Sequence, residues 1–387
     1  MSRPAHDPPP SPSLRTIARH WTRLGVTGFG GPPTHIALLR ALCVQEHGWL
    51  NAAEFEDTIA ATNLLPGPAS TQLAIYCAWR LRGARGALVG GLCFIAPGLV
   101  VIIALAAILL SHHPPTWFLG AAAGAGAAVP AVALHAASSL TPSSLERAGP
   151  RPLARARWLV YGALGATTTI VAGQFVVLAL VGCGVAELTI RSAGTTRAAF
   201  VPLGIGTAGA VGGLGALAWV ALKVGALSYG GGFVIVPLMQ HDVVTTYHWM
   251  TGTQFLSAIA LGQITPGPVV QTIAVVGYAA GGLGGALLAA LVAFGPSFAF
   301  VLVGARHFTS IRDNVGAQSF LNGAGPCVIG AIAGSSVALT RSFVHPWQAV
   351  VLSAALVWLF ALRRGVVVGL LACACAGVVL ALAGVGV

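Results

Sequence analysis

The stretch N-L-L-P-G-P-A-S-T-Q occupies residues 63–72, and its counterpart Q-I-T-P-G-P occupies residues 263–268. Both lie in apolar surroundings. Proline lacks a backbone donor and its ring clashes with the preceding turn, so each P-G-P ends a helix. The second proline, Pro68 or Pro268, suits the first turn of a new helix. Each stretch therefore predicts a helix that is broken in two.

The two stretches belong to a repeat that runs through the chain. Matched positions at an offset of 200 include Gly30 with Gly230, Trp49 with Trp249, and Pro66 with Pro266. After one deletion the offset is 199, as for Pro97 and Pro296. So many matched glycines, prolines and tryptophans indicate a duplication. We expect a disordered tail over residues 1–13, followed by homologous repeats over residues 14–197 and 198–387.

The composition places these repeats in a membrane. Of 387 residues, 56% are hydrophobic and 7% are charged, and the mean hydropathy is +0.85. A soluble domain carries about 25% charged residues, so the chain cannot cover a water-facing surface. Apolar runs of about 20 residues recur, which predicts an all-α, multi-pass integral membrane protein with roughly 10–13 transmembrane helices, broken helices included.

The positive charge fits a membrane topology better than nucleic-acid binding. The net charge is +11, and arginines cluster in short loops, as positive-inside loops do. The loop at residues 80–85 has three arginines and its counterpart at 279–285 has none. The next loop reverses this, because residues 111–116 lack arginine while the counterpart contains Arg306 and Arg312. Matching loops on opposite sides predict inverted repeats, although Arg341 dissents.

The broken helices predict an anion site. A half-helix that begins inside the membrane presents free N–H groups and the positive end of its dipole. Such breaks persist only where they pack in protein or line a cavity, so we expect four of them to converge near the midplane. The expected substrate-binding residues are Gly30, Gly31, Pro32, Asn63, Pro66, Gly67, Pro68, Ser70, Thr71, Gln72, Gly230, Gly231, Gln263, Pro266, Gly267, Pro268, Gln271, Arg23 and Lys223. The alternative is that glycine and proline are simply common in membrane helices.

Ionisable residues are few. Lys223, the only lysine in the chain, aligns with Arg23, and a basic group within a membrane helix is usually functional. The alternative for Arg23 is an interfacial stripe that reaches to the surface. Glu56, Asp57 and His35 are the candidates for proton coupling, since an acid near the membrane can titrate usefully. The two acids also suit a solvated helix start.

Enzyme and cofactor chemistry find no support. The seven cysteines follow no framework or metal-ligand spacing. The chain has no paired membrane acids, no H-E-x-x-H motif and no convincing Ser/His pair. We therefore expect no catalytic residue, no metal and no cofactor.

The motifs together resemble the chromate ion transporter family in its long two-domain form. The resemblance rests on G-F-G-G-P at 28–32, H-G-W-L at 47–50, the stretch at 63–72, and Y-G-G-G and Q-I-T-P-G-P in the second half. It covers residues from about 14 to 387. It implies a secondary carrier that expels chromate, with sulfate also open as a substrate. It also implies functional roles for Gly30, Gly31, Pro32, Pro66, Gly67 and Pro68.

Some residues depart from the family pattern. Asn63 stands where members commonly have glutamine, although Gln263 keeps it in the second half. Ala96-Pro97-Gly98 replaces a more usual Leu-Pro-Ser, and the first helix is unusually polar. These departures bear on substrate preference.

The sequence therefore predicts a carrier of a tetrahedral oxyanion in the cell inner membrane. The leading hypothesis is chromate efflux that gives chromate resistance, with proton coupling as one option. A sulfate transporter and an anion channel are the alternatives. The expected partners are chromate or sulfate and membrane lipid, with no nucleic acid; a homodimer is left open.

Overall fold

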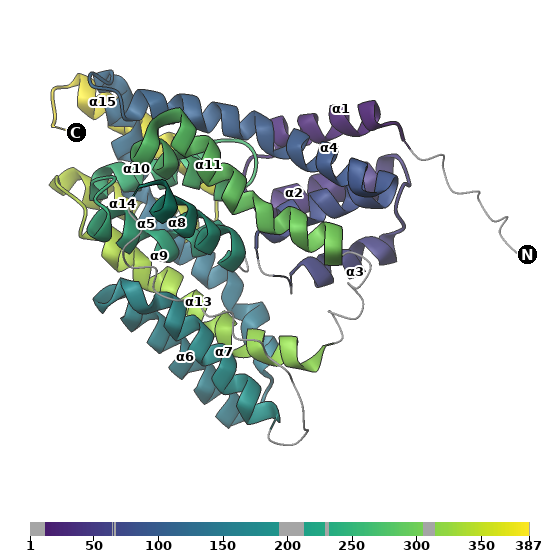
Figure 1. Ribbon diagram of the computed structural model, residues 1–387. Coiled ribbons are helices and arrows are strands. Elements are labelled where there is room, and N and C mark those ends of the chain that lie inside the picture. The colour runs from purple at the N-terminus through teal and green to yellow at the C-terminus, as the bar shows by residue number, and fades with distance from the viewer. Residues whose placement is uncertain are drawn as a thin grey trace, which may run out of the picture.

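Helices built from the apolar runs make up the computed structural model (Figure 1), which describes residues 12–63, 65, 67–192, 213–228, 232–304 and 314–386. These residues contain no strand. The first half comprises α1 (Leu14–Thr27), α2 (Pro32–Arg40), α3 (Ala52–Thr62), α4 (Ala69–Leu109), α5 (Thr116–Ala148), α6 (Pro152–Val171) and α7 (Val176–Ser192). The second half comprises α8 (Leu214–Leu227), α9 (Ile235–Gln240), α10 (Gly252–Ile264), α11 (Ile273–Gly304), α13 (Val315–Thr340), α14 (Pro346–Leu356) and α15 (Val366–Leu382).

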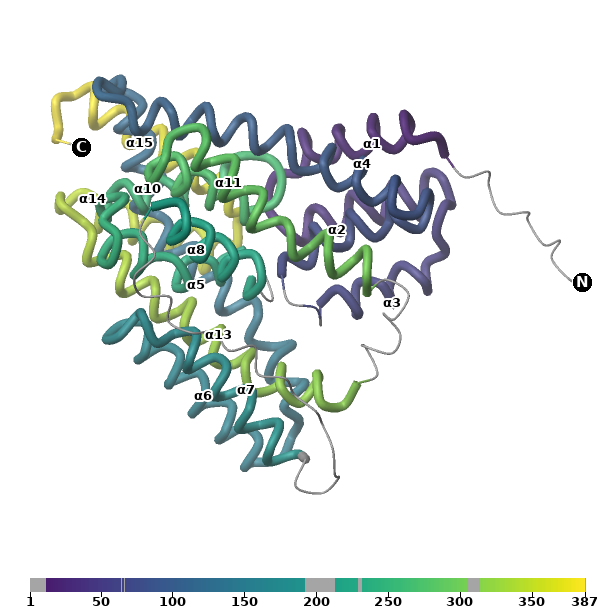
Figure 2. Tube along the Cα trace, in the orientation of Figure 1, coloured from purple at the N-terminus to yellow at the C-terminus, as the bar shows by residue number. Residues whose placement is uncertain are grey.

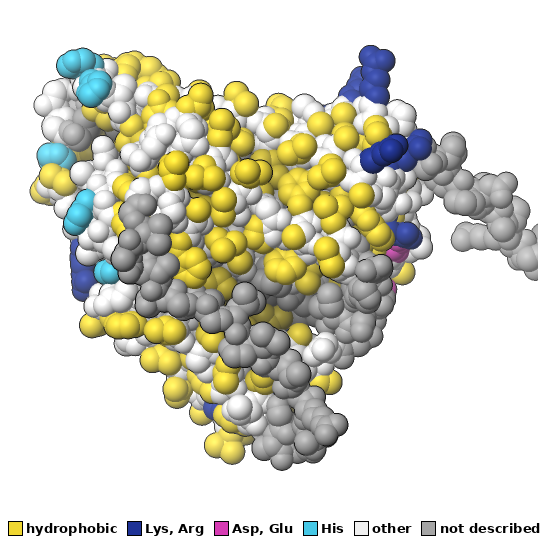
Figure 3. Space-filling view, in the orientation of Figure 1, with side chains coloured by type: hydrophobic (Ala, Val, Ile, Leu, Met, Phe, Trp, Pro, Cys, Tyr) yellow, Lys and Arg dark blue, Asp and Glu magenta, His cyan; other side chains and the backbone are white. Residues whose placement is uncertain are grey.

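The all-α membrane architecture is confirmed. Among the described helices, five are long and apolar enough to cross a membrane, and three shorter ones are apolar. The five lie over residues Ala69–Leu109, Thr116–Ala148, Gly173–Arg191, Val269–Gly304 and Val315–Thr340. Hydrophobic side chains accordingly spread across the described part of the face seen in Figure 3, and charged side chains there lie at its margins.

The two halves repeat even in their irregularities. A π-helix at Ala41–Glu46 follows α2, and another at His241–Thr246 follows α9, at the offset of 200. Inside α4 the backbone turns at Arg82 and Gly83, and inside α11 it turns at Gly281 and Gly282. Gly83 and Gly282 have φ of +57° and +61°, a conformation that side chains with a Cβ disfavour. Glycine therefore stands at both turns, which are 199 residues apart.

The motif-bearing segments are hairpins of half-helices. Glu54, near the start of α3, forms an ion pair with Arg80, near the turn in α4. Gly67 and Pro68, which lie between α3 and this turn, are therefore at the inner tip of the hairpin. In the same way, the ring centroids of His20 in α1 and His47 after α2 lie 5.0 Å apart. The Gly28–Gly31 segment is thus the inner tip of a second hairpin.

Equivalent long helices run in opposite directions. Gly91 of α4 packs against the ring of Phe298 in α11. Four residues earlier, Ala87 shares a buried cluster with Val301. These two contacts show that α4 and α11 are antiparallel. Figure 2 shows the two helices side by side. The halves are related as inverted repeats.

The halves are also intertwined. α13 of the second half packs against α5, α6 and α7, and α5 of the first half packs against α14 and α15. Glycines allow the backbones to approach closely, as Gly165 does against Cys327 and Gly124 against Cys373. Small residues at such contacts are typical of membrane helix packing, where lipid provides no hydrophobic drive between helices.

Two groups of arginines lie at the same end of the molecule. The turn in α4 holds Arg80, Arg82 and Arg85. The second arm of α4 leads away from this end, and α5, about 50 Å long at 1.5 Å per residue, returns to it. The α5–α6 connection therefore brings Arg147 and Arg151 to the same end, which we call the arginine-rich end.

Candidate anion-binding site

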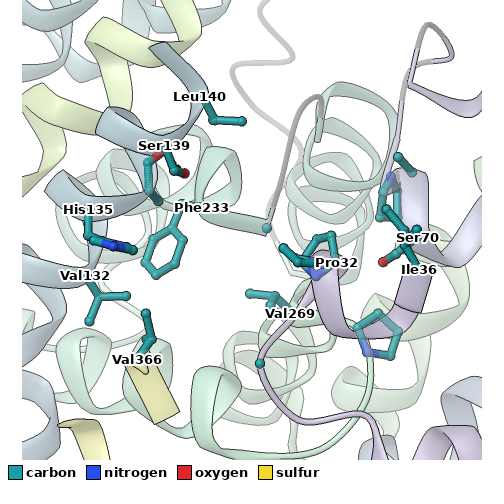
Figure 4. Close-up of a pocket in the computed structure, with 18 of the residues that line it drawn as sticks. Pro32, Ile36, Ser70, Val132, His135, Ser139, Leu140, Phe233, Val269 and Val366 are labelled. Carbon is teal, nitrogen blue, oxygen red and sulfur yellow. Dashed lines mark hydrogen bonds between the residues drawn. The ribbon is translucent and has the colours of Figure 1, made fainter. Parts of the chain in front are cut away.

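A cavity of about 560 Å³ lies between the hairpin tips and α5. Figure 4 shows Pro32, Ile36 and Ser70 on one side of it and the α5 residues His135 and Ser139 on the other. The predicted site residues that line it are Gly30, Gly31, Pro32, Asn63, Pro68, Ser70, Gln263 and Pro268. Residues from both halves thus face one space.

The tips of the two halves touch. The backbone N–H of Gly267, in the second P-G-P, donates to the carbonyl of Gly28 at 3.0 Å. Gly31 lies close to Val269, with 3.8 Å between the Cβ position of the glycine and a methyl carbon of the valine. The expected convergence of helix breaks is therefore present for the described parts of the tips. Pro66, Gly230 and Gly231 lie outside the described residues.

Backbone donors reach the cavity from two helix starts. Pro68 and Pro268 precede helical turns that have no side-chain cap. Because the first amides of a helix have no partner within it, the N–H groups of Ala69, Ser70, Val269 and Val270 remain available. All four residues line the cavity. The positive ends of two helix dipoles accompany them.

An amide side chain adds an unused donor. Asn63 and Gln263, equivalent in the repeat, both line the cavity. The Nε2 atom of Gln263 is buried and has no hydrogen-bond partner among the described residues. A buried N–H without an acceptor costs about 1–3 kcal/mol, so a ligand oxygen at this position would remove a penalty that the protein otherwise carries.

The start of α2 offers fewer donors than its position suggests. Pro32 and Pro33 occupy its first turn, and neither has an N–H group. The donors that remain near this break are the amides of Gly30, Gly31 and Thr34. The glycine break therefore shapes the cavity more than it supplies hydrogen bonds.

His35 connects the two tips of the first half. Its side chain is buried, with Nε2 3.0 Å from the carbonyl of Gly28 and Nδ1 3.2 Å from the hydroxyl of Ser70. A carbonyl only accepts, so Nε2 carries the proton. In a neutral ring Nδ1 then accepts from Ser70, whose hydroxyl proton points away from the cavity. His35 thus bridges Gly28 and Ser70, and its protonation state sets the direction in which the Ser70 hydroxyl proton points.

Several predicted residues lie behind the cavity wall. Gln271 donates to Thr265 at 3.0 Å and to the carbonyl of Pro266 at 2.8 Å, so its amide holds its own break together. Thr71 and Gln72 are fully buried and do not line the cavity. Gly67 and Gly267 have φ of +113° and +94°. These residues shape the tips, and the structure does not bring them to the open space.

The two predicted cations require a correction. Lys223 forms an ion pair with Asp242 on the neighbouring hairpin arm, and its ammonium lies 5.9 Å from the ring centroid of Trp219. Arg23 is exposed on α1. Neither residue lines the cavity. Arg23 and Lys223 do occupy equivalent positions in the two repeats. Those positions are on the outer arms of the hairpins, and neither side chain reaches the tips.

The acidic candidates lie on an exposed face of α3. Glu56 forms an ion pair with Arg40 at 2.6 Å, and about half of each side chain is exposed. Asp57 is exposed beside it. Neither acid lines the cavity. They lie on α3, which ends just before Asn63, and are nearer the arginine-rich end than Asn63 is.

A polar stripe on α5 was missed by the sequence reading. His135, Ser139, Ser143 and Arg147 recur every four residues and line the cavity. Within the described part of the wall, Arg147 supplies the one lysine or arginine side chain. The spacing of four within an apolar helix was a readable signal.

Within the described residues, the cavity wall is exposed toward Arg147 and packed at the other end. Ser139, Ser143 and Arg147, which line the cavity, are all exposed, so this part of the wall faces the arginine-rich end. Toward the opposite end, α10 packs against α5, where the Cβ position of Gly126 lies 3.4 Å from atoms of Leu256 and Ser257. The described residues hold no group of three His, Cys, Asp or Glu side chains that could bind a metal ion.

The amino-acid sequence of the chain is similar to a known protein family and to several known proteins. The family model described as chromate transporter matches residues 15–188 and 215–378. A chromate transport protein of Cupriavidus metallidurans is 31% identical over 347 residues, which cover 86% of this chain and 84% of that protein. A probable chromate transport protein of Synechococcus elongatus is 29% identical over 350 residues, 87% of each chain. No solved structure matches the chain.

Proposed function

The chain belongs to the chromate transporter family, and we propose that it is a secondary carrier that exports chromate from the cytoplasm across the inner membrane. Such export would give chromate resistance.

The observation that carries this proposal is the set of donors around one cavity. Helix starts at Ala69 and Val269, the unpartnered amide of Gln263 and the guanidinium of Arg147 all belong to its wall. No aspartate or glutamate lines it among the described residues. A helix end contributes about 0.3–2 kcal/mol toward an anion, so several of these groups acting together are needed to replace the water around a dianion.

The position of the open side supports export. Loops rich in arginine stay in the cytoplasm, so the arginine-rich end is assigned to the cytoplasmic side. The cavity then opens toward the cytoplasm, with Arg147 at its mouth. A cationic mouth raises the local concentration of anions, which suits capture of a dilute cytoplasmic oxyanion.

The closed side supports a carrier rather than a channel. A channel needs a continuous path, whereas here α10 rests on α5 beyond the tips. Inverted repeats with a site between them are typical of carriers that expose the site to each side in turn.

Proton coupling belongs to the same proposal. His35 is the nearest titratable group behind the donors, through its contact with Ser70. A protonated ring would donate to Ser70 and turn the serine proton toward the cavity, where it favours an anion. Glu56 and Asp57 are further candidates on α3.

Uptake of radiolabelled chromate into inside-out membrane vesicles tests the proposal. We expect saturable uptake that an imposed pH gradient accelerates. Uptake that never saturates and ignores the gradient would instead indicate a channel. Competition by excess sulfate in the same vesicles separates the substrates: half-inhibition by sulfate at a lower concentration than by unlabelled chromate would make this a sulfate carrier.

A further inference from the structure

One contact between the hairpins and the long helices exists in only one of the two described halves. In the second half, α10 packs against α5, with the Cβ position of Gly126 3.4 Å from the Leu256 Cβ and from the Ser257 nitrogen. Thr253 and Ala123 flank a small space of about 140 Å³ beside this contact. We call this contact, between α10 and α5 at Gly126, the second-half gate.

The repeat identifies the equivalent contact in the first half. The offset of 200 relates Leu256 and Ser257 to Glu56 and Asp57 of α3, and the offset of 199 relates Gly126 to Gly325 of α13. Between these two described helices the contact is absent. α3 has no extensive contact with α13, and Gly325 lines the cavity instead. The open side of the cavity is therefore the place where a first-half gate would form.

Both halves have the means to form this contact. A glycine stands at each matched position, which permits close approach of two helices. At Gly325 the nearest atom to a Cβ would be the Ser144 hydroxyl, at 3.7 Å, so space is free on this side. The hairpins share their π-helices and their glycine turns, so the position of the second hairpin is a template for the position that the first could adopt.

We infer that the protein has a second conformation, in which α3 packs on α13 at Gly325 while α10 leaves α5 at Gly126. This inference rests on the proposed function as a carrier. The cavity would then close toward the arginine-rich end and open at the opposite end. Closure of one gate and opening of the other exposes the same tips to each side in turn.

The two gates differ in chemistry. The second-half gate buries Leu256 and the backbone of Ser257, whereas the first-half gate would cover Glu56 and Asp57. α13 contributes no charged residue to meet them over 315–340. The charged or titratable groups on neighbouring elements include Arg40 of α2, which pairs with Glu56, and His135 and Arg147 of α5. On α3 itself Glu54 pairs with Arg80 of α4. Beside α13, Glu187 of α7 approaches Gly323 and pairs with Arg157 and Arg191.

Burial of a carboxylate costs more than burial of the neutral acid. Formation of the first-half gate is therefore favoured when Glu56 or Asp57 takes up a proton. Lower pH should shift the protein from the present conformation to the second one.

Disulfide cross-linking of each gate tests the inference. A disulfide needs Cβ atoms about 3.5–4.5 Å apart, and the Cβ position of Gly126 lies 3.4 Å from the Leu256 Cβ. Gly126→Cys with Leu256→Cys should therefore cross-link readily in membrane vesicles. Glu56→Cys with Gly325→Cys should cross-link only if the second conformation is visited. The four single substitutions control for the seven native thiols.

We expect both pairs to cross-link, and we expect each bond to lower chromate uptake below the rate that the same variant shows after reduction. Acidification lowers the yield of any disulfide because the thiolate is the reacting form. The yield of the Gly126→Cys/Leu256→Cys variant should fall more on acidification than the yield of the same variant with Glu56→Gln and Asp57→Asn added. If Glu56→Cys/Gly325→Cys does not reach the membrane, Asp57→Cys/Gly325→Cys replaces it.

A first-half pair that never cross-links in a protein that still carries chromate overturns the inference and leaves the proposed function standing. Wild-type vesicles that carry no chromate overturn the proposed function. Cross-linking does not depend on the substrate, so the two failures are distinguishable.

Discussion

At the scale of single residues, the P-G-P loops depend on glycine for two separate reasons. Gly67 has a φ of +113°, which residues with a side chain rarely adopt. Its Cβ position would also lie 2.7 Å from the Nε2 atom of Gln72 and 3.1 Å from the carbonyl of Gly225. The backbone angle and the surroundings thus exclude the same substitution.

Gly67→Ala should therefore abolish chromate uptake while the protein still reaches the membrane. The strained angle costs about 1–3 kcal/mol, and the methyl group displaces Gln72 from the tip. Gly295→Ala, within α11 and with no neighbouring atom of the described residues within 4 Å, is the matched control. If Gly67→Ala took up chromate at the same rate as this control, the proline break would not be part of the transport site.

The contact between His35 and Ser70 carries a prediction about pH. Ser70→Ala removes a hydroxyl that contacts the imidazole and belongs to a residue of the cavity wall. We expect the KM for chromate to rise and to lose its dependence on pH, because the ring can no longer redirect a donor. Thr167→Ala, which removes a hydroxyl that bonds within its own exposed turn, is the control. A pH profile unchanged by Ser70→Ala would exclude this relay.

At the scale of elements, α5 serves both halves of the site. Toward its start it closes the cavity by packing against α10 at Gly126, and toward its end it lines the open side with polar residues. Ser139 donates to its own helix at 2.8 Å, and Ser143 does so at 3.2 Å. The permanent charge of this stripe is therefore that of Arg147.

Arg147→Gln should raise the KM for chromate about tenfold, which corresponds to about 1.4 kcal/mol. It should leave the maximal rate nearly unchanged, because the arginine attracts the anion at the mouth rather than at the tips. Arg155→Gln, at an exposed position of α6 away from the cavity, provides the comparison. Equal KM values for the two variants would show that Arg147 does not attract the anion and serves only to keep its loop on the cytoplasmic side.

At the scale of the whole molecule, the halves depend on each other. α6 and α7 find their main partner in α13, and α15 finds its partner in α5. Separation of the repeats would expose these glycine-rich surfaces to lipid. The duplication therefore built one structure from two copies rather than two domains in a row.

Residues 1–197 or 198–387 expressed alone should be degraded and give no chromate resistance. Co-expression of both pieces should restore part of the resistance, since the contacts between α5, α13 and their partners form without a covalent link. Resistance in cells is the measurement, with the abundance of each piece checked in membranes. Resistance from either piece alone would contradict the interdependence.

The sequence was sufficient for much of this because the signals are local or periodic. Pro66-Gly67-Pro68 breaks a helix wherever it occurs, and a fixed offset reveals a duplication without reference to space. The unequal arginine loops likewise revealed inversion. By contrast, Arg23 and Lys223 were both expected at the site because they align in the repeat. The alignment does not show where their side chains point. Their side chains leave the tips, and Lys223 meets Asp242 instead.

By itself, the sequence determined the membrane class, the two inverted halves, the broken helices and the family, because composition, spacing and motif survive without coordinates. Only the tertiary structure decided which donors share a space. His135 and Arg147 join Gln263 and Ser70 through helices far apart in the chain, whereas Gln271 and Thr71 turn into the protein. It also decided that the cavity is open on one side, because contacts between helices, unlike breaks within them, are not written in any single segment.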